Sequence, residues 1–63
     1  MKLYIYNQES MEVVAIATGE TNEECEQKAE AAKYYPSDDL AWTYTPAFGT
    51  NEGLIESSEV EMI

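Results

Sequence analysis

Apolar and strand-favouring residues alternate from the first positions of the chain. In an extended segment over residues 2–7, Leu3 and Ile5 point to one side and Tyr4 and Tyr6 to the other. A second run, residues 11–18, is rich in β-branched and small apolar residues and follows a polar stretch. The two runs predict a β-hairpin.

The pairing inside this hairpin depends on the length of its turn. A two-residue loop would set three cross-strand pairs, Tyr6 with Met11, Tyr4 with Val13 and Leu3 with Val14. An odd-length loop or a bulge would shift these pairs.

The next segment, residues 21–35, predicts one amphipathic helix. Thr21 and Glu24 match a capping box, in which a hydroxyl and a carboxylate satisfy the first free amides. The inward stripe is thin and consists of Cys25, Ala29 and Ala32. Pro36 ends the helix.

The last third of the chain predicts a single further strand, residues 40–46, which Pro46 stops. Residues 47–63 contain two glycines and four glutamates, and we expect an irregular acidic tail with a short extended or helical piece near Leu54. The expected fold is therefore one α+β domain, residues 1–63, of ββαβ order. It has a three-stranded, mainly antiparallel sheet with the helix on one face.

Both faces of this sheet carry apolar residues. Leu3, Ile5, Val14 and Ile16 would fill the core below the helix, whose small stripe permits a close approach. The other face would carry Tyr4, Tyr6, Met11, Val13 and Ala15, and the third strand adds either Trp42 and Tyr44 or threonines. If these aromatic residues point outward, the patch exceeds what a monomer normally exposes.

Three interpretations of the second face remain open. The C-terminal segment could fold back and cover it with Phe48, Leu54 and Ile55. Two copies could pair their faces or strand edges as a homodimer, which would support a small core. The face could also be a dedicated partner surface, since tyrosine and tryptophan are common in binding hot spots.

Charge is the most unusual property of the composition. Thirteen acids against three lysines give a formal net charge of −10 for 63 residues. The chain is nevertheless 44% hydrophobic and should fold. The N-terminus has no signal-peptide core and no stretch is long enough for a membrane span, so we expect a cytoplasmic protein.

Catalytic chemistry finds little support in the sequence. The chain has no histidine, no arginine, no glycine-rich phosphate loop and one cysteine, Cys25, which we interpret as a small core thiol. Adjacent acids such as Asp38 and Asp39 are more typical of a solvated turn than of a cation site. We expect no enzyme activity, no cofactor and no metal.

The acids instead predict a basic partner. Three lysines against 13 acids oppose direct nucleic-acid binding. Glu23, Glu26 and Glu30 recur about once per helical turn, ~5 Å of rise, which is comparable to the phosphate spacing of a nucleic acid. With Asp38 and Asp39 they are the candidate charged contacts, and Tyr4, Tyr6, Trp42 and Tyr44 are the candidate apolar contacts.

The helix TNEECEQKAEAAK, the turn SDD and the tail NEGLIESSEVEMI resemble small acidic proteins of bacteriophages and mobile elements that act against host defences, including anti-CRISPR proteins and DNA mimics. The resemblance lies in size, charge and element order. It implies a stoichiometric inhibitor that occupies a positively charged nucleic-acid channel or blocks an assembly surface.

Our leading hypothesis is therefore a non-enzymatic inhibitor of a host defence or nucleic-acid-binding protein, acting by charge mimicry or surface blocking. One alternative is an oligomeric sponge for a nucleotide signal, with a pocket between subunits lined by Tyr4, Tyr6, Trp42 and Tyr44. Another is a structural protein that assembles through its aromatic face or a free strand edge.

Overall fold

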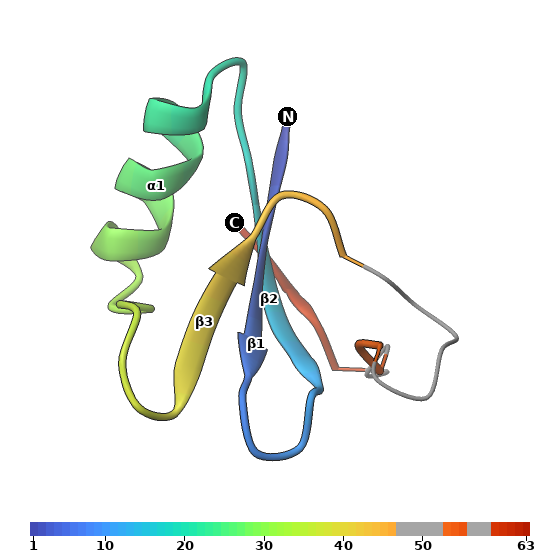
Figure 1. The fold of residues 1–63 in the computed structure, drawn as a ribbon. Coiled ribbons are helices and arrows are strands. Elements are labelled where there is room, and N and C mark those ends of the chain that lie inside the picture. Colours follow the sequence, from blue (N-terminus) through green and yellow to red (C-terminus); the bar gives the residue numbers. More distant parts are fainter. Residues whose placement is uncertain (47–52, 56–58) are drawn as a thin grey trace.

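A computed structural model gives the fold and describes residues 1–46, 53–55 and 59–63 (Figure 1). Four strands and one helix are assigned among these residues, namely β1 (Lys2–Asn7), β2 (Val13–Thr18), α1 (Asn22–Ala31), β3 (Leu40–Thr43) and β4 (Glu61–Met62). The expected ββαβ order is thus correct, and it is followed by a short additional strand.

The strands form one mixed sheet in the order β3-β1-β2-β4. β1 pairs antiparallel with both β2 and β3, whereas β4 runs parallel to β2. The expectation of three strands is therefore wrong, because β4 adds a fourth strand at one edge of the sheet. β4 holds its place through backbone bonds, because the amide of Ile63 donates to Ile16 and the amide of Thr18 donates to Ile63, each at 2.9 Å.

The tail contains the extended piece that was expected near Leu54. Ile55 forms a parallel bridge with Glu12, and its carbonyl accepts the amide of Val13 at 3.1 Å. Residues 53–55 and 59–63 therefore return along β2 (Figure 1). The third strand is also shorter than expected and ends at Thr43, since the chain bends over Tyr44 and Thr45.

The β1–β2 turn is longer than two residues. The Asn7 side chain accepts the amides of Glu9 and Ser10 at 2.8 and 3.1 Å, and the Asn7 carbonyl accepts the amide of Met11 at 2.7 Å. Met11 closes the turn in the left-handed region, with φ of 61°. The pairs expected from a two-residue loop are therefore wrong, and the structure pairs Tyr6 with Val13, Tyr4 with Ile16 and Leu3 with Ala17.

A β-bulge explains the remaining change of register. Tyr6 pairs with Val13 but Ile5 pairs with Ala15, so Val14 is the extra residue. A shift by one residue exchanges the faces of a strand. Ala15 therefore lies under the helix and Ile16 lies on the far face beside Tyr4, the reverse of the expectation for both residues.

The helix begins at the expected residue, with only the threonine half of the capping box formed, and it ends earlier than expected. The Thr21 hydroxyl accepts the amide of Glu24 at 3.1 Å, and the Glu24 carboxylate accepts the amide of Glu20 at 3.1 Å. The helix ends at Ala31, not near residue 35, because Lys33 adopts φ of 66°.

The bonds at this end form a Schellman motif. The amide of Lys33 donates to Glu30 and the amide of Tyr34 donates to Ala29, both at 2.9 Å. Tyr34 also packs against the core cluster that includes Ala29, which is the apolar contact usual in this motif.

The core lies between α1 and one face of the sheet, and its six fully buried residues are Leu3, Ile5, Ala15, Ala17, Cys25 and Ala29. Cys25 and Ala29 allow the helix to lie close to β1 and β2, as expected, whereas Ala32, the third residue of the predicted stripe, is exposed at the C-cap. Trp42 and Tyr44 pack against the rim of this cluster. Because Trp42 is paired with Ile5 on β1, the aromatic side of β3 faces the helix and Thr43 faces the other way.

Candidate functional site

The charged candidates lie on two neighbouring segments. Glu23 and Glu30 on α1, and Asp38 and Asp39 in the turn before β3, all have exposed side chains. Among the residues that the structure describes, no charged or polar side chain is buried. These four carboxylates are therefore available to a partner.

Glu26 differs from the other two glutamates of the expected ladder. Its side chain is half-buried, and its carboxylate accepts the Tyr44 hydroxyl at 2.8 Å. The same hydroxyl lies 3.1 Å from the Asn22 carbonyl, so Tyr44 ties the first part of α1 to the chain after β3. Burial, followed by the hydrogen bond and charge of Glu26, raises the pKa of Tyr44 to about 12.

Tyr34, which we did not select from the sequence, connects the two edge strands. Its hydroxyl donates to the Glu61 carboxylate on β4, and its carbonyl accepts the Trp42 indole N–H from β3 at 2.8 Å. The hydrogen bond to Glu61 is the main cause of the raised pKa of Tyr34. The only sequence signal for this role was an aromatic residue directly after the helix.

The four aromatic candidates are divided between the two faces of the sheet. Tyr4 and Tyr6 lie on the face away from the helix, whereas Trp42 and Tyr44 pack toward it. They therefore do not come together within one chain to line a common pocket. The threonine side of β3 joins Tyr4 and Tyr6 instead, with Thr43 paired directly with Tyr4.

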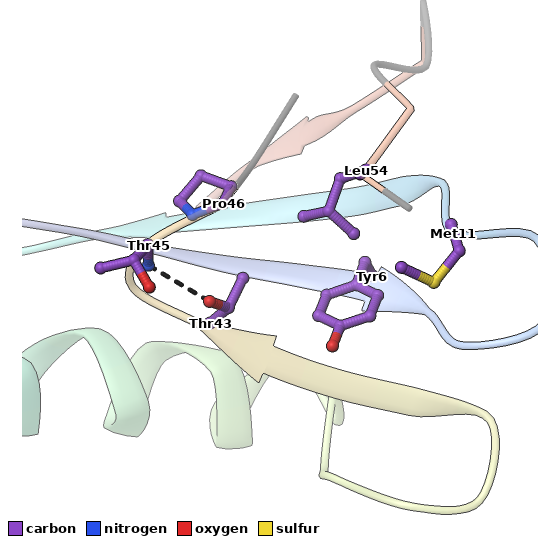
Figure 2. A pocket seen from close by; sticks show the side chains of 7 residues that line it. Tyr6, Met11, Thr43, Thr45, Pro46 and Leu54 are labelled. Atoms are coloured by element: carbon purple, nitrogen blue, oxygen red, sulfur yellow. Dashed lines mark hydrogen bonds between the residues drawn. The ribbon is translucent and has the colours of Figure 1, made fainter. Parts of the chain in front are cut away.

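A pocket of about 170 Å³ opens on this far face, between the sheet and the returning chain (Figure 2). Besides the backbone of Gly53, six side chains line it, those of Tyr6, Met11, Thr43, Thr45, Pro46 and Leu54. Of these, sequence analysis selected only Tyr6 as a binding residue. The alternation of β3 made Thr43 a possible neighbour, but the sequence did not decide which side of β3 faces Tyr6.

The returning segment 53–55 covers part of the far face of the sheet. Leu54 is buried, with 7% of its surface exposed, whereas Ile55 is 54% exposed. The covering interpretation is thus confirmed for Leu54 and wrong for Ile55. Phe48, its third member, lies outside the described residues.

Cys25 is fully buried, and its thiol lies 3.5 Å from the Met1 carbonyl, as expected for a core residue. Within the described part of the chain, no group of three or more Cys, Asp or Glu side chains is arranged to hold a metal ion. No helix in that part is long and apolar enough to cross a bilayer.

Comparisons with known proteins found no matching family model, no matching curated protein and no matching solved structure.

Proposed function

We propose that this chain is a non-enzymatic binding protein that attaches to a positively charged protein surface and blocks it. The proposed target is a nucleic-acid-binding protein, such as a component of a host defence system, whose basic groove would otherwise receive phosphates. The chain would act stoichiometrically, as an inhibitor of the phage type does.

The exposed acidic surface carries this proposal. The protein has a formal net charge of −10, and its described core contains only apolar side chains and one thiol. The carboxylates of the described residues are therefore not in the core, and Glu23 and Glu30 are exposed on the helix α1. A fixed array of carboxylates binds with less loss of conformational entropy than the same charges on a disordered chain.

Electrostatic attraction would act mainly on the rate of encounter. Complementary charge accelerates association and is screened beyond about 10 Å at ~0.1 M salt. Contacts that exclude water would then determine the lifetime of the complex. We therefore expect the association rate to fall steeply with salt and the dissociation rate to change less.

The test is charge reversal on the helix. Glu23→Lys with Glu30→Lys changes two exposed side chains of α1 and leaves the Glu26–Tyr44 bond intact. Glu9→Lys with Glu12→Lys is the matched control, because it alters net charge equally at exposed positions of the β1–β2 segment. Each protein would compete with duplex DNA for a panel of basic DNA-binding proteins across a salt series.

The helix variant should lose at least tenfold in inhibition while keeping the native circular dichroism, and the control should lose much less. Equal losses would show that only net charge matters and would remove α1 from the proposed surface. Absence of inhibition by the native protein at low salt, across the whole panel, would refute the proposal.

A further inference from the structure

The far-face pocket lies in a strongly acidic protein, but the residues that the structure describes around it are uncharged. Their six side chains include no carboxylate and no ammonium group. The surrounding protein nevertheless carries a net charge of −10, so its long-range field attracts cations and repels anions. An anionic ligand such as a nucleotide would meet no lysine in this lining to compensate its phosphates.

The side chains that line the pocket are suited to binding a flat, weakly hydrated cation. Figure 2 shows the Tyr6 ring between Thr43 and Met11, with Leu54 above it. A guanidinium group stacks on aromatic rings and sheds water more readily than an ammonium group, while its three-carbon stem packs on apolar side chains. A lysine would lose its strong hydration here without gaining a carboxylate partner.

The polar atoms of the pocket are also suited to a guanidinium group. Thr43 and Thr45 both carry hydroxyl groups, and the Thr43 oxygen accepts the Thr45 amide at 3.2 Å, which leaves it capacity for a second bond. Guanidinium has five donors and no acceptor, so hydroxyl oxygens are suitable partners. A volume of about 170 Å³ limits the occupant to a single side chain or a molecule of similar size.

We infer that this pocket receives one arginine side chain of the basic partner, with the guanidinium group stacked on Tyr6 and hydrogen-bonded to threonine hydroxyls. This inference rests on the proposed function and names the part of the partner that is recognised. The carboxylates bring the basic surface close, and the pocket distinguishes arginine from lysine within it.

The experiment uses two peptides of the same length, one containing arginines and the other lysines at the same positions. Binding is measured by calorimetry at low salt with the native protein, Tyr6→Leu and Tyr35→Leu. Tyr6→Leu removes the aromatic face and keeps an apolar side chain. Tyr35 is 54% exposed and does not line the pocket, so Tyr35→Leu is the matched control.

Native protein and Tyr35→Leu should bind the arginine peptide about two- to fivefold more tightly than the lysine peptide, the ratio expected from one exposed cation–π contact. Tyr6→Leu should lose most of this preference, because only the threonine hydroxyls then remain to favour arginine. Equal binding of both peptides by the native protein, or an undiminished preference in Tyr6→Leu, would overturn the inference and leave the proposed function standing. If the native protein binds neither peptide, the result would contradict both this inference and the proposed function.

A second measurement does not depend on the variant folding. Titration of the native protein with arginine amide should shift the NMR signals of the Tyr6 ring and of the methyl groups of Met11 and Leu54. Lysine amide at the same concentration should shift them less. Unchanged signals at these three residues would overturn the inference.

Discussion

Removal of the Tyr44 hydroxyl should weaken the attachment of α1 to the sheet. In Tyr44→Phe the ring keeps its place at the rim of the core, but the Glu26 carboxylate loses the donor that lies at 2.8 Å. Glu26 is half-buried, so water replaces this donor only in part.

The size of this effect follows from the kind of bond that is lost. A hydrogen bond to a charged group contributes about 1.5–3 kcal/mol net. Because Glu26 is only half-buried and solvent screens the bond at the rim, we expect less than this range, about 1 kcal/mol. Tyr44→Phe should therefore lower the free energy of unfolding by about 1 kcal/mol at neutral pH.

The sign of the pH dependence follows from the same bond. The folded pKa of Tyr44 is higher than the unfolded value of 10, so the stabilisation is fully present below pH 10. It is lost as the pH rises toward about 12. The difference in stability between the native protein and Tyr44→Phe should therefore shrink across this range.

Urea unfolding followed by Trp42 fluorescence measures these values, because Trp42 packs against the core cluster. Tyr35→Phe, at a 54% exposed position, should leave the stability within about 0.5 kcal/mol of the native value. Equal stability of Tyr44→Phe and native protein at neutral pH, or a difference that stays constant up to pH 12, would refute this reasoning.

Three further changes test the local geometry by urea unfolding or amide exchange. Lys33→Gly should be about 1 kcal/mol more stable than Lys33→Ala, the reverse of the usual order in a helix, because residue 33 has φ of 66°; a more stable alanine variant would contradict the Schellman assignment. Gly19→Ala should cost about 1 kcal/mol, since its new methyl group would lie 3.0 Å from Glu24 Cβ and Cγ, and an unchanged urea midpoint would argue against this contact. Tyr34→Phe should accelerate amide exchange at Ile63 severalfold by removing the bond to β4, whereas unaltered exchange would show that backbone pairing alone holds this strand.

Local chemistry made the first half of the fold predictable. The alternation in β1 and the capping residues of α1 act within a few positions of one another, so the sequence identified both elements and the start of the helix. The helix end was predicted from Pro36, but Lys33 terminates it earlier by adopting a backbone conformation that its residue type rarely takes.

The features that sequence patterns missed depend on distant partners. Val14 and Ile16 are both β-branched and suit either face, so only the bulge assigns Ile16 to the far side. β4 contains two residues, too few for a periodic signal. The sequence does not distinguish Glu26 from Glu23 and Glu30, because its hydrogen-bond partner Tyr44 lies 18 positions away in the chain.

The bulge has a consequence for changes in chain length. Deletion of Val14 would leave Val13 beside Ala15, and both would keep their present faces and partners on β1. Deletion of a residue beyond the bulge, such as Ile16, would instead exchange the face of a neighbouring alanine. Val14 is therefore the position in β2 at which descendants of this sequence could lose a residue and still retain the interior that the helix covers.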